Sequence, residues 1–261
     1  MLSEQSHNKL QDMFLLTFDI DWAPDFVIDE VASVLIANRV KTTWFVTHKS
    51  DAISRLRLHP ELFELGIHPN FYPGSTHGKT EDEIMSHIKN IVPDAISMRT
   101  HGLYQNSNFL RKTVRDFGIK IDVSLFLPYT PNITYHYLPL GNTIAPLFRV
   151  PFFWEDDLEL FNPERSWNIN DRKYNQVGLK IFNFHPIHIA LNSCSAESYT
   201  KLKMKSPIQN CTPADIQQYK NHSQGTGTLF LQLVNLLSGN GNFVIDLMKT
   251  ISEQARCHRN R

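Results

Sequence analysis

Apolar and polar residues alternate along the first half of the chain in blocks that predict strands and helices in turn. Short β-prone apolar runs predict strands, and apolar positions at helical spacing predict helices. The predicted strands are residues 13–18, 42–47, 61–67, 95–98 and 119–123, and the predicted helices are 25–39, 81–91 and 108–117. Asp25 is placed to cap the first helix, and Gly118 to end the last. This rhythm predicts a parallel sheet covered by helices and curled into a closed or nearly closed barrel.

The pattern changes after residue 124. Residues 125–149 are rich in Pro, Tyr and Asn and lack a helical period, which predicts a long irregular excursion over the sheet face. A strand is predicted at 179–184, and helices at 213–220, 228–237 and 243–253. The lysine-rich run at 201–205 has two interpretations, a binding site for a diphosphate or a solvated strip of the surface. No repeat or linker divides the chain, so we expect one domain over residues 1–261, with a polar extension at 1–12.

Composition excludes several classes of function. The 26 basic residues balance the 26 acidic ones, so the chain has no net field that would gather nucleic acid or an anionic membrane. No stretch approaches the roughly 20 apolar residues of a membrane span. Residues 1–12 lack the apolar segment of a signal peptide. Three widely spaced cysteines without a CxxC pair favour a reducing compartment, so we expect a cytoplasmic protein.

Two acidic residues follow the first predicted strand. Asp19 and Asp21 are two positions apart, so on a continuing strand both would project from one face with nothing basic beside them. Like charges this close raise one pKa unless they share a cation. The pattern favours a metal bound by one carboxylate while the other acts as a base. The alternative is a strand end whose acids are solvated or cap the next helix.

Polar, titratable residues follow apolar strands at four further places. Any one of them is weak support for a site, but five such places in order on one βα-rich domain favour a catalytic constellation at the carboxyl ends of the strands. The four places are His68, the pair Arg99 and His101, residues 154–157, and His185.

The order and types of these residues resemble the polysaccharide deacetylase family, carbohydrate esterase family 4, over roughly residues 15–186. The resemblance is nearest to the branch with an Asp-x-Asp first motif, which includes deacetylases of surface-polysaccharide biosynthesis. It implies an α/β fold, a distorted (β/α) barrel of seven strands. It also implies metal-assisted hydrolysis of N-acetyl or O-acetyl groups.

The resemblance implies a metal bound by Asp21, His68 and a second histidine. The family places that histidine four residues after the first, where this chain has Tyr72 among residues that disfavour a continuous helix. We predict that His77, displaced onto an inserted loop, is the third ligand. The alternative is that His101, where the family usually has proline, or water completes the shell. Zinc is the expected metal, and cobalt or iron(II) would fit the same ligands.

The resemblance also implies the catalytic groups. Asp19 matches the catalytic base, Arg99 matches the arginine that orients it, and His185 matches the general acid. One of Asp156 and Asp157 is expected to tune His185. The residues expected to contact substrate are His101, Tyr72 and Trp154.

We therefore predict a cytoplasmic, metal-dependent hydrolase that removes an N-acetyl group from an amino sugar. An intracellular location favours a nucleotide- or lipid-linked precursor of a surface glycan as substrate. One alternative is a hydrolase of another small linear or cyclic amide on the same scaffold. Another is a non-catalytic protein that binds metal or sugar. The expected partner is the acetylated amino sugar, without nucleic acid, and the sequence predicts no oligomeric state.

Overall fold

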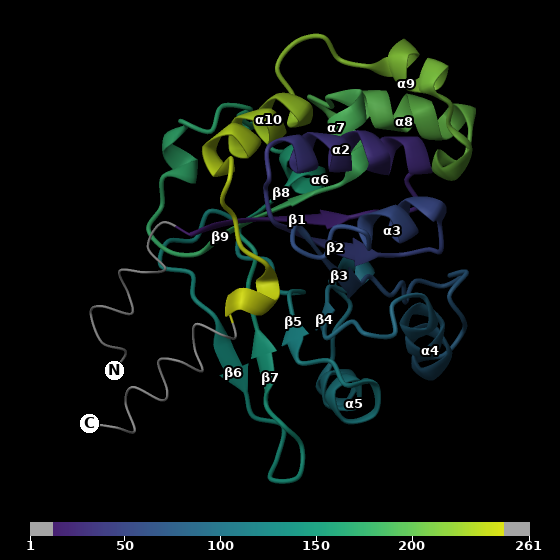
Figure 1. The fold of residues 1–261 in the computed structure, drawn as a ribbon, viewed down its shortest axis with the longest axis vertical. Helices are drawn as coiled ribbons and strands as arrows, with labels where there is room; N and C mark the ends of the chain where they lie inside the picture. The colour runs from purple at the N-terminus through teal and green to yellow at the C-terminus, as the bar shows by residue number, and fades with distance from the viewer. Residues whose placement is uncertain (1–12, 248–261) are drawn as a thin grey trace.

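A single, largely parallel sheet organises the computed structural model, which describes residues 13–247 (Figure 1). Among these residues nine strands lie in the order β6-β7-β5-β4-β3-β2-β1-β9-β8. Neighbouring strands are parallel except for β6 and β7, which are antiparallel. The strands are β1 (Phe14–Asp19), β2 (Thr42–Val46), β3 (Phe63–Ile67), β4 (Ser97–Met98), β5 (Ile121–Asp122), β6 (His136–Leu138), β7 (Leu147–Arg149), β8 (Trp154–Glu155) and β9 (Lys180–Phe184).

The predicted α/β fold is confirmed, but the sheet has nine strands in the described part of the chain rather than seven. The segment 125–149, expected to be irregular, contains β6 and β7, which form an antiparallel pair at one edge. Strand β8, which was also missed, forms the other edge. Because β6 and β8 do not pair with each other, the sheet is an open half-barrel rather than a closed one.

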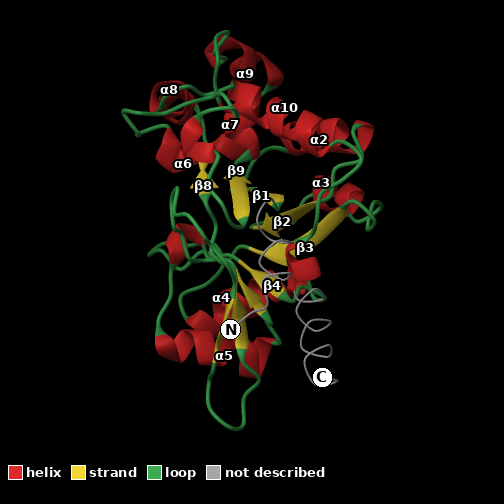
Figure 2. Ribbon diagram, turned by 90° about the vertical axis from the view of Figure 1, so that its left-hand side faces the viewer, coloured by secondary structure: helices red, strands yellow, loops and turns green. Residues whose placement is uncertain are grey.

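Helices cover the sheet in two groups. Figure 2 shows α2, α7, α8, α9 and α10 above the sheet, and α4 and α5 at the opposite end. The helices predicted around 25–39, 81–91, 108–117, 213–220 and 228–237 are all present, whereas α3, α6, α7 and α8 were not predicted. The bounds are α2 (Asp25–Ala37), α3 (Asp51–Leu56), α4 (Glu81–Ile91), α5 (Ser107–Phe117), α6 (Asp156–Glu159), α7 (Pro186–Leu191), α8 (Ala196–Lys205), α9 (Pro213–Tyr219) and α10 (Thr226–Leu237).

Some expectations concern the ends of the chain. The polar extension at 1–12, the later part of the predicted helix 243–253, and Cys257 lie outside the described residues. The other two cysteines, Cys194 and Cys211, are free thiols. No helix of residues 13–247 combines the length and the apolar character needed to cross a bilayer.

The side chains of β1 and β9 divide between an apolar and a polar face. The two strands run in parallel with Thr17 opposite Asn183 and Phe18 opposite Phe184. Phe18 and Phe184 both contact Phe230 of α10, so this face of the sheet joins the helical layer. Because side chains alternate along a strand, the neighbouring polar residues point to the other face. This register gathers polar groups of β1 and β9 on the concave side of the sheet.

Asp25 has a different role from the one expected. The N-cap residue of α2 is Pro24, which makes no side-chain cap bond. The Asp25 carboxylate instead accepts a hydrogen bond from the Ala52 amide (3.0 Å) and pairs with Arg55 (3.3 Å). It therefore joins α2 to α3 rather than capping its own helix.

Candidate active site

An arginine and an asparagine hold the Asp19 carboxylate at the end of β1. Arg99 Nη1 donates to Asp19 Oδ1 (3.1 Å), and Asn183 Nδ2 donates to Asp19 Oδ2 (2.9 Å). Arg99 Nη1 also donates to Thr17 Oγ1 (3.0 Å) and to Asn183 Oδ1. Both carboxylate oxygens are thus oriented, one by a donor on the neighbouring strand β9 and the other by a donor that follows β4, as a group that must accept a proton in a fixed direction requires.

The guanidinium of Arg99 is fully buried between two aromatic rings. Its centre lies 4.7 Å from the ring centroid of Phe45 and 4.5 Å from that of Phe152. Its Nε donates to the Val123 carbonyl oxygen (3.2 Å). A Cβ atom on Gly66 would approach the Phe45 ring to 2.7 Å, so the absence of a side chain there keeps the ring in place. Packing and hydrogen bonds therefore fix the arginine that faces Asp19.

Asp21 reaches the site from a turn rather than from the strand. Strand β1 ends at Asp19, and Asp21 and Trp22 both have positive φ angles, of 35° and 55°. This left-handed conformation costs an L-residue about 1–2 kcal/mol. Strained backbone of this kind clusters at functional sites.

Asp21 meets two histidines in a tight cluster. Asp21 Oδ1 lies 3.3 Å from His68 Nε2 and 3.2 Å from His101 Nδ1, and these two nitrogens are 3.2 Å apart. Asp21 Oδ1 is buried and makes no hydrogen bond of good geometry. One ligand atom from each of the three residues lies within 4.8 Å of the others. A carboxylate and two imidazoles that converge in this way are a donor set for a divalent metal.

The sheet order explains why His68 and His101 meet. Strands β3 and β4 are neighbours, and the two histidines lie just beyond their carboxyl ends. His68 Nδ1 lies 2.7 Å from the Arg99 carbonyl oxygen, which can only accept, so Nδ1 carries the proton. In the neutral ring, Nε2 then carries a lone pair, which is directed at Asp21 and His101. A metal ion would satisfy both this lone pair and the unpaired Asp21 oxygen, so the residues fit the group that the resemblance implies.

His77, the predicted third ligand, lies outside this cluster. Its Nδ1 accepts a hydrogen bond from the Asn70 amide (3.2 Å), and its ring stacks on His87 with the centroids 5.2 Å apart. Burial and the neighbouring His87 lower the pKa of His77 to about 4. The structure thus places His101, the alternative third ligand, beside Asp21 and His68. His77 lies outside this group of three residues.

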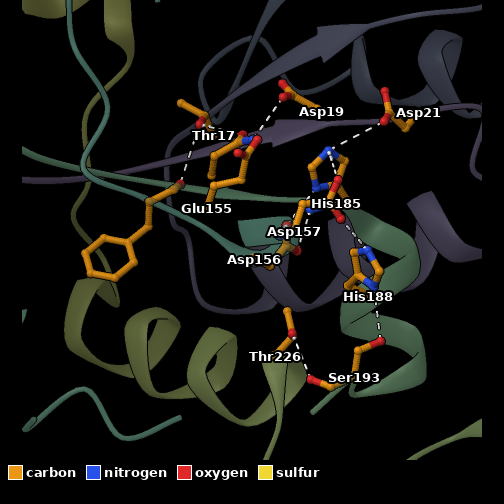
Figure 3. A network of polar contacts seen from close by, with 12 residues as sticks. Thr17, Asp19, Asp21, Glu155, Asp156, Asp157, His185, His188, Ser193 and Thr226 are labelled. Atoms are coloured by element: carbon orange, nitrogen blue, oxygen red, sulfur yellow. Dashed lines mark hydrogen bonds and ion pairs between the residues drawn. The ribbon is translucent and has the colours of Figure 1, made fainter. Parts of the chain in front are cut away.

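Asp156 holds His185 in place. Its carboxylate contacts His185 Nδ1 (2.6 Å) and accepts from the His185 amide (2.8 Å), while His185 Nε2 faces Asp21 Oδ2 at 3.5 Å (Figure 3). Burial lowers the pKa of His185, but the charges of Asp157 and Asp156 outweigh it and hold this pKa well above the ordinary value. Asp157 instead pairs with His188 Nε2 (2.7 Å). Both acids that the sequence left open act on His185: Asp156 makes the short contacts, and Asp157 Oδ2 lies 3.9 Å from His185 Nε2 and adds its charge.

Sequence reasoning missed two members of the site, Glu155 and Asn183. Glu155 lies opposite Asn183 in the β8–β9 register, and Asn183 Nδ2 lies 3.4 Å from Glu155 Oε1. Glu155 also converges with Asp19 and His185, each within 4.8 Å of the others. Burial raises the pKa of Glu155 to about 7, with His185 opposing and Asp19 adding to the shift. The available signal was Asn183 itself, a polar residue in an otherwise apolar stretch of strand.

The two aromatic residues expected to contact substrate lie in different environments. Trp154 is 1 % exposed, and its ring packs on Phe182 and Phe184. It is a core residue and is not available to a substrate, so that expectation is corrected. Tyr72 is 56 % exposed, and its ring centroid lies 5.6 Å from that of His101. Tyr72 therefore stands at the rim of the cluster.

Comparison with known proteins shows the family of this chain. Residues 16–203 match the model of a family described as WbmS-like polysaccharide deacetylases. The chain belongs to this family. The resemblance seen in the sequence is thereby confirmed. The description of the family is that of a carbohydrate deacetylase. No curated protein matches the chain.

A solved structure shares this fold. The chain is similar to a protein from Bordetella bronchiseptica described as a polysaccharide deacetylase involved in O-antigen biosynthesis, with a TM-score of 0.76 and 29 % identity over 88 % of this chain and 92 % of that one. A peptidoglycan deacetylase, PdaC from Bacillus subtilis, gives a TM-score of 0.47 and 13 % identity over 96 % of each chain.

The raised pKa of Glu155 predicts a pH-dependent effect of Glu155→Gln on stability. The pKa of about 7 in the folded protein lies above the ordinary 4.5, so the stabilisation from the bound proton is complete below pH 4.5 and is lost as pH rises through 7. Gln imitates the protonated acid at every pH. Relative to the parent protein, the variant should therefore gain about 3 kcal/mol of unfolding free energy between pH 4.5 and pH 8, measured by urea unfolding of metal-depleted protein.

The matched control for this prediction is Glu30→Gln, because Glu30 is exposed on α2. Its stability relative to the parent should not change with pH over the same range. A pH-independent difference for Glu155→Gln would show that Glu155 is ionised in the folded protein across that range.

Proposed function

We propose that this protein is a metal-dependent N-deacetylase acting on an amino sugar, presented as a nucleotide- or lipid-linked precursor of a surface glycan. The observation that carries the proposal is that an oriented carboxylate, Asp19, and the His185 imidazole both border the ligand set. Asp19 Oδ1 lies 3.7 Å from His68 Nδ1, and His185 Nε2 lies 3.5 Å from Asp21 Oδ2. The similarity to a protein involved in O-antigen biosynthesis supports the choice of a surface glycan. A cytoplasmic location remains a prediction from the sequence.

We assign Asp21, His68 and His101 as the metal ligands. Three protein ligands leave open coordination positions, as catalytic sites require. A divalent metal there, with zinc the first choice, would supply Lewis acidity to the acetyl carbonyl oxygen and the attacking water. The proton on His68 Nδ1, held by the Arg99 carbonyl oxygen, fixes the tautomer that such a ligand needs.

Asp19 and His185 then divide the proton transfers between them. Asp19 accepts a proton from the water whose oxygen bonds to the acetyl carbon. The amide C–N bond breaks, and His185 Nε2 gives its proton to the departing nitrogen. Asp156 on Nδ1 keeps the His185 ring oriented and protonated until that step. The products are acetate and the free amino sugar.

The proposed activity is tested by measuring acetate release from N-acetylhexosamine 1-phosphates and sugar nucleotides. Asp19→Asn removes the proton acceptor, so turnover should fall about 10²–10⁴-fold, the usual scale for general-base catalysis. Since Arg99 has no other ionic partner among the described residues, the variant should also unfold at a lower temperature. Asp25→Asn, at a carboxylate outside the site, serves as the control.

Two results would overturn this function. Hydrolysis of a small linear or cyclic amide without acetate release from any amino sugar would favour the other amide hydrolase. Binding of N-acetylated sugar to the metal-loaded protein, with no turnover of any amide, would favour the non-catalytic alternative.

Metal content distinguishes the two candidate third ligands. Elemental analysis of His101→Ala protein should show little bound metal, because one of the three converging donors is lost. His77→Ala is the matched control, since its ring lies outside this group of three residues, and it should keep the metal content of the parent. The reverse pattern would return the third position to His77 and require the 70–77 loop to move in the metal-bound state.

His185 is expected to matter most for poor leaving groups. Amide cleavage needs a proton on the departing nitrogen, whereas an activated aryl acetate leaves without one. His185→Ala should therefore reduce amide turnover far more than hydrolysis of the aryl ester. In the parent, the alkaline limb of the pH–rate profile should lie well above 6.5, and Asp156→Asn should move it to lower pH. Equal losses on both substrates would assign His185 to packing.

A further inference from the structure

A cavity of about 520 Å³ opens beside the candidate metal centre, between α3 and α4. Its size lies within the range of small-molecule sites. Trp22, the residue after Asp21, forms part of its wall. The Trp22 ring centroid lies 5.6 Å from that of His101 and 5.7 Å from that of His77. The cavity and the metal centre are therefore separated by one aromatic side chain.

The lining of this cavity is cationic. Lys49 and Arg57 line it, and no carboxylate does. No carboxylate of the described residues pairs with Lys49, which is exposed. Arg57 has Nη1 on Asp94 (3.2 Å), a side chain that is 72 % exposed, and Nη2 on the Ile91 carbonyl oxygen (3.2 Å). Other polar residues that line the cavity include Ser54, His87 and Asn90.

A second cavity next to the catalytic residues has the opposite character. It lies beyond His188 and is lined by Asp157, Tyr199 and Lys203. Its single cation, Lys203, sits over the Tyr199 ring, 5.2 Å from the centroid. A carboxylate in the wall disfavours an anion there. Diphosphate binding was one interpretation of the run 201–205. The carboxylate in this wall makes the run a weaker candidate for binding a diphosphate than the cavity of Lys49 and Arg57.

We propose that the cavity of Lys49 and Arg57 binds the phosphate or diphosphate ester of the substrate. This inference rests on the proposed function and adds the chemical class of the group that joins the sugar to its carrier. With the acetamide at the metal centre, the rest of the sugar passes Trp22 and places its anionic ester among the cations. Lys49 and Arg57 supply charge-assisted hydrogen bonds, which are the strong ones for phosphate oxygens. Nucleotide and polyprenyl carriers share this diphosphate chemistry.

Binding of pyrophosphate tests the cavity without any turnover. Calorimetry on metal-depleted protein avoids chelation of the metal by the probe. Lys49→Glu should weaken pyrophosphate binding at least about 10-fold, because a hydrogen bond to a charged group is lost and a repulsive charge is added. Lys203→Glu is the matched control, an identical charge reversal in the other cavity, and should bind as the parent does. Weakening by Lys203→Glu alone, or binding that neither variant changes, overturns the proposal.

Kinetics then connect the cavity to the substrate. For the N-acetylhexosamine 1-phosphate, Lys49→Glu should raise KM about 10-fold, and by much more than for the uncharged methyl glycoside. Equal effects on both sugars would overturn the proposal. If no sugar is deacetylated while pyrophosphate still binds through Lys49, the proposed function fails and the anion site stands. Comparing sugar nucleotides with polyprenyl diphosphate sugars in micelles identifies the carrier, and either preference supports the site.

Discussion

The buried charge of Arg99 is the constraint around which the rest of the site is arranged. A guanidinium with no exposed surface needs a counter-charge and hydrogen-bond acceptors, since removing one partner of a buried ion pair typically costs about 3–5 kcal/mol. Asp19 supplies the charge, and three strands supply the acceptors through Thr17, Asn183 and the carbonyl oxygen of Val123. These contacts fix the relative register of β1, β4 and β9 as well as the Asp19 carboxylate. One ion pair therefore serves both the fold and the proposed proton acceptor.

Five acidic residues crowd this region, and their partners separate their roles. Asp19 faces Arg99, Asp21 faces two histidines, and Asp156 faces His185. Asp157 makes its short contact with His188 (2.7 Å), and from 3.9 Å its charge also raises the pKa of His185. Among residues 13–247 the hydrogen-bond partner of Glu155 is the Asn183 amide at 3.4 Å, and burial holds the pKa of Glu155 near neutrality. Like charges can share so small a volume because each has a different hydrogen-bond or ionic partner or keeps a proton.

The sequence predicted what depends on local pattern and missed what depends on pairing between distant segments. Apolar runs followed by polar residues were enough for β1, β3, β9, Asp21 and His68. The convergence of His101 with Asp21 and His68 depends on β3 and β4 being neighbours, which no spacing along the chain reveals. Glu155 and Asn183 meet only through the β8–β9 register, and β8 was too short to carry an alternating pattern. The strands β6 and β7 were hidden in the same way, because each is only three residues long.

The turn at Asp21 and Trp22 shows how one local conformation serves two sites. On a regular strand, successive side chains point to opposite faces, so a ligand and its neighbour would lie on different sides of the sheet. Here both residues have positive φ angles, and the chain presents Asp21 to His68 and His101 while Trp22 faces His101 and lines the adjoining cavity. The backbone strain of two left-handed residues costs less than the activity that would be lost if a ligand of the proposed metal were misplaced. Because the Trp22 ring contacts His101 on one side and forms the cavity wall on the other, a substrate that crosses it is positioned by both sites at once. Such a substrate reacts only if the separation between its acetamide and its anionic group matches the separation between the two sites.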